Sequence, residues 1–169
     1  MSENEERIPF EANAGVLSYA TGLTLATAID MTMAGVAEAG KQGLSMAIAI
    51  VDSGGHLINF TRMDGAMLAS IQIATDKAFT AVAGKLPTYL WQEIVRAGEL
   101  PQLFIHERWT AFPGGFPIIK GDQLLGGIGV SGATQFGDTS VARAALLAGG
   151  FSTEAADIYL KEVLGREIT

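Results

Sequence analysis

Apolar residues recur at helical spacing along three stretches of the chain. In the first, apolar side chains follow one another at steps of three and four residues, and they are Leu25, Ile29, Met33 and Val36. Thr24 can cap this helix, which is expected to end near Gly40 or Gly43. In the second, residues 67–84 run without proline and carry apolar side chains on two faces, which is typical of a helix buried on both sides. In the third, Asp138 can cap a helix that runs to about Gly149.

Two shorter helices and two hairpins complete the pattern. Thr88, which follows a proline, can cap a helix through Arg96, and a last helix is expected over about 153–164. Short apolar runs on both sides of glycine-containing turns predict the hairpins, which pair 45–51 with 56–63 and 116–120 with 123–131. Because a helix follows each hairpin, the sequence predicts an α+β fold, with one antiparallel sheet flanked by helices.

The same pattern divides the chain into three parts. Residues 1–20 mix charge, proline and glycine without a sustained period, so we expect an N-terminal arm there. Residues 21–150 form a single domain, and residues 151–169 a C-terminal helical extension. Within the domain, residues 98–115 form a long loop. Loops longer than about 12 residues in compact domains are commonly functional, so this loop is a candidate wall of a site.

Composition adds a subunit interface to this picture. Hydrophobic residues make up 49% of the chain and charged residues only 17%, so less charge than usual is available to cover a monomer. The stretch 67–84, with its two apolar faces, is the segment best suited to a subunit contact. We therefore expect a homo-oligomer.

Charge and residue counts exclude several classes of function. The 11 Lys and Arg residues against 18 Asp and Glu give a net charge of −7, which opposes the attraction of phosphate backbones, so nucleic acid is not an expected partner. Apolar runs are far shorter than the roughly 20 residues of a membrane helix, so a membrane is not expected either. An acidic N-terminus without an apolar signal region and the lack of cysteine fit a cytoplasmic protein. Two histidines without cysteine are too few for a metal site.

Candidate catalytic chemistry centres on a lone lysine and the two histidines. Lys77 is the only cation in the stretch 67–84 and stands among small residues, so it either reaches solvent along its stem or serves a site. His56 follows two glycines at the mouth of the first hairpin. Its imidazole either faces a ligand there or is an ordinary surface side chain. His106 lies in the long loop, where it either lines a pocket or belongs to an ordered turn.

Candidate ligand contacts come from Arg62 and from glycine-rich segments. Arg62 either pairs with Asp64, two residues along the strand, or holds a ligand carboxylate. The run 126–132 lacks the lysine of a phosphate-binding loop, so it is a weak match to that motif. Its glycines either let a helix approach the strand closely or present backbone N–H donors to an anion, and both can hold at once. Together with Arg62 and His106, the ligand-binding candidates are Trp109, Phe112, Gly114, Gly115, Ser131 and Gly132.

Four motifs, in order, resemble those of the GlcG/HbpS-like family. Residues 47–66, AIAIVDSGGHLINFTRMDGA, resemble an apolar strand with V-D-x-x-G-H-L followed by R-M-D-G-A. Ala74, Lys77 and Ala78 match A-x-x-K-A, and residues 114–118 match G-G-x-P-I. Residues 126–132, with Asp138 and Ala142 after them, match G-x-x-G-V-S-G and D-x-x-x-A. The resemblance covers about residues 23–149.

This resemblance implies a profilin-like sheet with helices on its faces, a homo-oligomer and a ligand site. The family includes haem-binding proteins, a domain appended to corrinoid adenosyltransferases and proteins of catabolic operons. We therefore expect a small-molecule-binding protein, an accessory to a catabolic pathway, with haem or another tetrapyrrole as the candidate cofactor. His56 or His106 would supply the axial ligand.

Two alternatives stay open. The first is a cofactor-independent lyase, isomerase or hydrolase acting on a small organic or aromatic acid, with Lys77 or His56 as acid and base and Arg62 as carboxylate anchor. The second is a structural or interaction subunit. For a binding site and for an active site alike, we expect the ligand between the hairpin mouth at 56–62, the helix with Lys77 and the loop 104–115.

Overall fold

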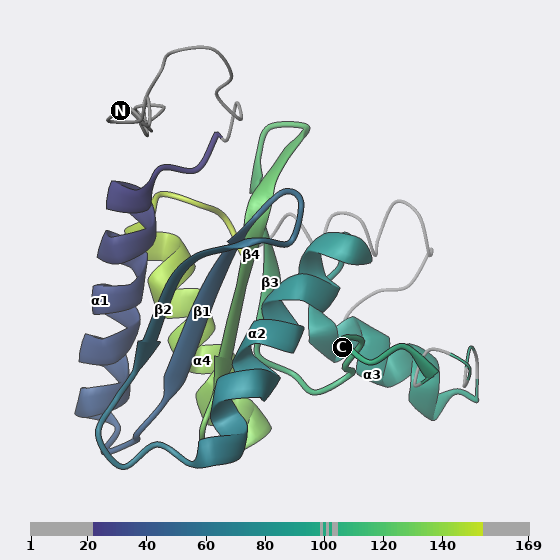
Figure 1. Cartoon of the computed structure of the whole chain (residues 1–169), viewed down its shortest axis with the longest axis horizontal. Coiled ribbons are helices and arrows are strands. Elements are labelled where there is room, and N and C mark those ends of the chain that lie inside the picture. Colours follow the sequence, from purple (N-terminus) through teal and green to yellow (C-terminus); the bar gives the residue numbers. More distant parts are fainter. Residues whose placement is uncertain (1–21, 99, 101, 103–104, 154–169) are drawn as a thin grey trace, which may run out of the picture.

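A computed structural model of the chain, which describes residues 22–98, 100, 102 and 105–153, contains a four-stranded antiparallel sheet (Figure 1). β1 pairs with β2 and β3 with β4, as the two predicted hairpins, and β1 also pairs with β4, so the strand order is β2-β1-β4-β3. The strands are β1 (Ala47–Asp52), β2 (Leu57–Arg62), β3 (Gly115–Lys120) and β4 (Gln123–Ser131). The predicted α+β fold is confirmed.

Helices cover both faces of this sheet. Among the described residues they are α1 (Leu25–Lys41), α2 (Leu68–Ala83), α3 (Thr88–Arg96) and α4 (Gln135–Ala148). α2 packs on one face against three strands, while α1 and α4 pack together on the other face (Figure 1). In the described part of the chain, no helix combines the length and the apolar character that a membrane crossing requires.

The packed face of α1 is made mostly of small residues. Thr24 caps the helix as predicted, since its hydroxyl accepts a hydrogen bond from the Thr27 N–H at 3.1 Å. The face that is buried against the core carries Ala28, Met31, Thr32, Gly35 and Ala39. The larger apolar side chains that mark the helix in the sequence, Leu25, Ile29 and Met33, are exposed. This exposed row is a surface available for the predicted homo-oligomer, which stays a prediction.

The beginning of α4 differs from the sequence-based expectation. The helix starts at Gln135, and Thr134 caps it by accepting a hydrogen bond from the Gly137 N–H at 3.3 Å. Asp138 was expected to be the cap, but it lies inside the first turn and its side chain is buried. Its carboxylate contacts Lys77 of a different helix.

Thr88 also has a different role from the predicted helix cap. It is the first residue of α3, and Pro87 occupies the cap position without a side-chain hydrogen bond. The Thr88 hydroxyl instead accepts a hydrogen bond from the Gly115 N–H at 2.9 Å, which joins the start of α3 to β3. The predicted N-terminal arm and the C-terminal helix from residue 154 onward lie outside the described residues.

Glycines of β4 allow α2 to lie directly on the sheet. A Cβ added at Gly129 would overlap the Ala74 carbonyl oxygen and lie 2.5 Å from the Ala78 nitrogen. One added at Gly127 would lie 2.5 Å from the Ala78 carbonyl oxygen. Helix backbone therefore rests on strand backbone, with no room for a side chain between them. For these two glycines the structure supports the close-approach interpretation.

Both sides of α2 find partners within the chain. One side packs on the sheet, and on the other Thr80 donates a hydrogen bond to the Arg108 carbonyl oxygen at 3.2 Å and accepts one from the Thr110 N–H at 3.0 Å. The loop before β3 therefore covers part of the helix that the sequence assigned to a subunit contact.

We predict that Gly129→Ala lowers the free energy of unfolding by about 1–3 kcal/mol, the usual cost of overpacking, because α2 must move away from β4. Gly40→Ala is the matched control. Gly40 lies in α1, and a Cβ added there meets no atom within 4 Å, so stability should stay the same or rise by up to about 1 kcal/mol. Urea unfolding followed by circular dichroism measures both changes. Equal stability of Gly129→Ala and the unmodified chain would contradict the close-packing account.

Candidate functional site

Lys77 is buried in α2 and forms an ion pair with Asp138 of α4. The side chains are only 2% and 6% exposed, and the Lys77 Nζ lies 2.7 Å from the Asp138 Oδ2. Nζ also donates a hydrogen bond to the Val130 carbonyl oxygen at 2.7 Å, and the Asp138 Oδ1 accepts one from the Ala133 N–H at 2.9 Å. The pair thus connects α2, the end of β4 and the start of α4.

Burial shifts the pKa values of both partners toward neutrality. Desolvation lowers the pKa of Lys77 below its ordinary value, although attraction to Asp138 opposes this shift. Desolvation likewise raises the pKa of Asp138, opposed by Lys77 and by backbone hydrogen bonds from Ala133 and Gly132. Because each shift brings the two pKa values closer together, a proton moves between these groups at a lower cost than between exposed ones.

A pocket of about 260 Å³, termed here the Lys77 pocket, opens onto this ion pair. One part of its lining is apolar and comes from Met67, Ile73, Phe112 and Pro113. The other part offers polar groups from α2, from α3, from the end of β4 and from the start of α4. Its residues are Lys77, Gln92, Ser131, Gly132, Ala133, Gln135 and Asp138. A ligand in this pocket would have its polar end at the ion pair.

Two glycines before and at the start of β3 make room for Lys77. Gly114 has a φ of +115°, where other residues are strained, and a Cβ there would lie 3.1 Å from the Lys77 Nζ and 2.7 Å from the Val130 carbonyl oxygen. A Cβ at Gly115 would lie 2.5 Å from the Lys77 carbonyl oxygen. These glycines, predicted as ligand contacts, lie next to Lys77 but do not line the pocket.

Four residues singled out in the sequence line the Lys77 pocket together, and they are Lys77, Phe112, Ser131 and Gly132. The two histidines and Arg62 do not line it. His56 is exposed beside the first turn, His106 is exposed in the loop, and Arg62 is exposed at the end of β2. Among the described residues, Arg62 forms no ion pair, either with Asp64 or with another acid.

The long loop and the first hairpin meet through Arg108. Its guanidinium lies 3.8 Å from the centre of the Phe79 ring and donates a hydrogen bond to the Gly55 carbonyl oxygen at 3.5 Å. Trp109 packs edge-on against Trp91 of α3, with ring centres 4.9 Å apart. Trp109 therefore anchors the loop on α3, and its ring is not part of the pocket lining.

Asp138 is the functional candidate that sequence reasoning missed. Its position before an apolar helical stretch indicates a cap, and this interpretation hid its role as a counter-charge. The useful signal was the lone lysine itself, because a buried ammonium group requires a buried acid nearby.

We predict that Lys77→Met lowers the free energy of unfolding by about 3–5 kcal/mol at neutral pH, because it leaves the Asp138 carboxylate buried without a cation. Without the attraction of the Lys77 ammonium group, the pKa of Asp138 in the folded state rises further above its pKa in the unfolded state. Between these two pKa values the folded state binds more protons than the unfolded state. Stability therefore recovers as the pH falls toward about 4.

The double variant Lys77→Met/Asp138→Asn should regain part of this loss at neutral pH, since no buried charge is left unpaired. Urea unfolding of both variants across the pH range measures the effect. The charge account fails if the loss in Lys77→Met is the same at every pH.

The sequence and the fold of this chain are similar to those of known proteins. Residues 23–147 match the family model described as haem degrading protein HbpS-like. Protein GlcG of Escherichia coli K12 is 38% identical over 98 residues, which cover 58% of this chain and 72% of GlcG. A crystal structure of a PduOC:haem complex has 29% identity and a TM-score of 0.74, covering 78% of this chain and 97% of that one.

A crystal structure of HbpS has 34% identity and a TM-score of 0.71, covering 79% of this chain and 94% of that one. The family model spans most of the sheet and helices described above, and the solved structures share their arrangement. The chain therefore belongs to the HbpS-like family, as the resemblance of its motifs to GlcG/HbpS-like sequences indicated.

Proposed function

We propose that this chain binds a small organic molecule in the Lys77 pocket. The observation that carries this proposal is the buried Lys77–Asp138 pair at the polar end of a pocket that is otherwise partly apolar. Burial perturbs the pKa values of both groups, and such groups facing a pocket are typical of functional sites.

The charges and the size of the pocket define the class of ligand. Lys77 and Asp138 compensate each other, so the pocket favours an uncharged polar group over a strong anion. The ammonium group has three N–H donors and uses two of them on Val130 and Asp138, which leaves one for a ligand oxygen. At about 260 Å³ the pocket is below the usual range of roughly 300–1,000 Å³ for drug-sized ligands. These features favour a small carbonyl or hydroxyl compound with an apolar part.

The same pair supports the enzymatic alternative. An ammonium group that donates to a carbonyl oxygen, beside a carboxylate whose pKa is raised, is suited to proton transfer at a carbonyl compound. In this alternative Lys77 and Asp138 are the acid and base, since His56 and Arg62 do not line the pocket.

We predict that Phe112→Ala weakens the binding of such compounds by about 10-fold or more, because it removes apolar surface from the pocket wall. Phe112 is 59% exposed, so its replacement should leave the fold intact. The control is Ile105→Ala, which removes an apolar side chain that is 80% exposed and does not line the pocket.

The measurement is a thermal-shift screen with small ketones, hydroxy compounds and their carboxylates, followed by calorimetry of the compounds that stabilise the chain. Stabilisation lost in Phe112→Ala and retained in Ile105→Ala supports the proposal. Equal stabilisation of both variants would mean that the ligand binds elsewhere.

Haem or another tetrapyrrole is the second candidate ligand, favoured by the similarity to the PduOC:haem complex. The described residues do not fit an enclosed haem site with a histidine ligand. The Lys77 pocket is too small for a tetrapyrrole, and the two histidines of the chain, His56 and His106, are exposed and line neither described pocket. A haem ligated by either histidine would therefore lie at the surface or between copies of the chain.

Hemin titration tests this second candidate. Ligation by histidine predicts a saturable, shifted Soret band that is lost in His56→Ala or in His106→Ala. Phe112→Ala should leave the band unchanged, because its effect is confined to the Lys77 pocket. A band that survives in the double variant His56→Ala/His106→Ala would rule out ligation by histidine.

A further inference from the structure

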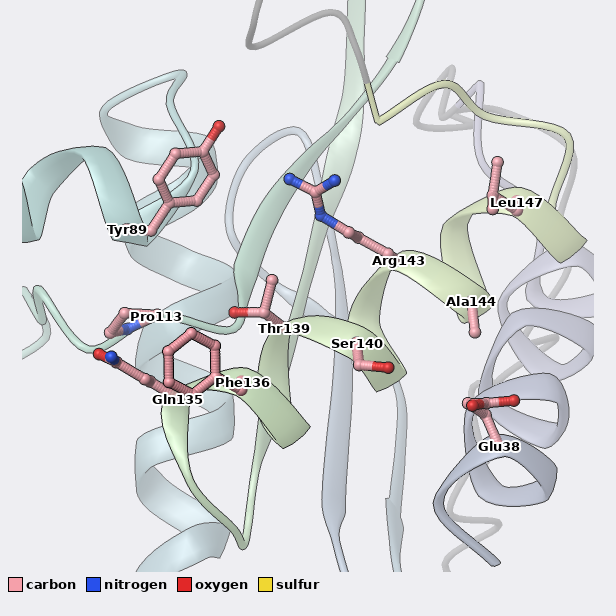
Figure 2. Close-up of a pocket in the computed structure, with 10 residues that line it drawn as sticks. All are labelled: Glu38, Tyr89, Pro113, Gln135, Phe136, Thr139, Ser140, Arg143, Ala144 and Leu147. Carbon is pink, nitrogen blue, oxygen red and sulfur yellow. The ribbon is translucent and has the colours of Figure 1, made fainter. Parts of the chain in front are cut away.

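A second concave surface, termed here the Arg143 groove, lies along the outer face of α4 (Figure 2). Its volume is about 700 Å³, and it is bordered by Glu38 of α1, Tyr89 of α3 and Pro113 of the loop before β3. Pro113 and Gln135 line both this groove and the Lys77 pocket, so the two are neighbours. The Arg143 groove is nonetheless a separate site, and the inference below does not rest on the proposed function.

Residues at helical spacing on α4 form the floor of the groove, and they are Phe136, Thr139, Ser140, Arg143, Ala144 and Leu147. Apolar side chains lie toward both ends of this row, since Phe136 is 77% exposed and Leu147 is 64% exposed. The cation lies between them. A row of this kind can contact the apolar body of a ligand while Arg143 binds its charged group.

Arg143 has no polar partner among the described residues. Its Nε is buried without a hydrogen bond, and the guanidinium forms no ion pair. Among the described residues, its guanidinium carbon lies 5.6 Å from the centre of the Phe116 ring. Figure 2 shows the guanidinium reaching from α4 toward Tyr89. A guanidinium carries five N–H donors, so this side chain offers a fork of donors that an acceptor from outside can use.

Arg143 is also the charge of the groove that no described residue compensates. The other charged lining residue, Glu38, accepts a hydrogen bond from the Gln42 side chain at 2.8 Å and pairs with Lys41 at 3.1 Å. Those two contacts hold the pKa of Glu38 below its ordinary value, so its charge is present but balanced. The groove as a whole therefore favours a negative ligand group at Arg143.

We propose that the Arg143 groove binds an apolar organic anion, a carboxylate carried on an aromatic or aliphatic body. The carboxylate takes the two-pronged hydrogen bonds of the guanidinium, which are the strong form of this contact. Thr139 lies one turn before Arg143 and brings a hydroxyl to the same face. Phe136, Ala144 and Leu147 contact the apolar body.

The test uses calorimetric titration of the full chain with 2-naphthoate and octanoate, and with the neutral amide 2-naphthamide. We expect saturable binding of a carboxylate at one site per chain and at least about 10-fold weaker binding of the amide, as loss of a charge-assisted hydrogen bond implies. Arg143→Met should weaken carboxylate binding by about the same factor. Arg143→Lys should have an intermediate effect, because a point charge replaces the fork.

Two controls separate this site from its surroundings. Arg96→Met removes an exposed arginine of α3 that pairs with Glu93 outside the groove, and it should leave binding unchanged. Phe112→Ala, which affects the Lys77 pocket alone, should also leave carboxylate binding unchanged. Failure of this inference is therefore distinguishable from failure of the proposed function.

Three results would overturn the inference. The first is the lack of saturable binding of either carboxylate at millimolar concentration. The second is equal carboxylate affinity of Arg143→Met and the unmodified chain. The third is a dimer, detected by light scattering, that Arg143→Met dissociates while no carboxylate binds, which would make the groove an interface between copies of the chain.

Discussion

The buried ion pair between Lys77 and Asp138 is the interaction on which the arrangement of this domain depends. Removing two charges from water costs several kcal/mol per ion, and the cost is offset only when the geometry is good and the remaining donors and acceptors are satisfied. Here the ammonium and the carboxylate lie 2.7 Å apart, and Val130 and Ala133 supply backbone partners. Three segments distant in sequence must therefore keep their relative positions for these contacts to form.

Glycine makes this geometry sterically possible. α2 approaches β4 so closely that Gly127 and Gly129 have no room for a Cβ, and Gly114 leaves space around the Lys77 ammonium group. The hydrogen bond from Gly115 to Thr88 then joins the start of α3 to the same region. The glycines act as packing elements, and the polar pocket exists because they let helix and strand backbones meet.

The two concave surfaces differ in their electrostatics although they share Pro113 and Gln135. In the Lys77 pocket the cation and the anion are both internal, so the pocket has little net charge to attract a ligand and favours hydrogen bonding. In the Arg143 groove the cation has no ion-pair partner among the described residues, and the carboxylate of Glu38 is held by Lys41 and Gln42, so the groove favours an anionic ligand group. Neighbouring sites on one scaffold thus select different ligand chemistry.

Local periodicity was enough to predict the four described helices, both hairpins and the cap at Thr24, because these features depend on residues a few positions apart. The motifs around Lys77 and 126–132 were also enough to indicate the family. The packed face of α1 was not predictable from its large apolar residues, since close packing against α4 favours small side chains and leaves Leu25, Ile29 and Met33 exposed.

The counter-charge of Lys77 was likewise outside the reach of local reasoning, because Asp138 lies 61 positions away and resembles a helix cap. Arg143 shows the same limit, since a cation on a helix is common in sequences, and only the structure shows that no described residue forms an ion pair with it. Short-range patterns determine which elements form, whereas the pairing of distant side chains depends on how closely those elements can approach. That distance is decided only when the glycines, the helices and the sheet come together in three dimensions.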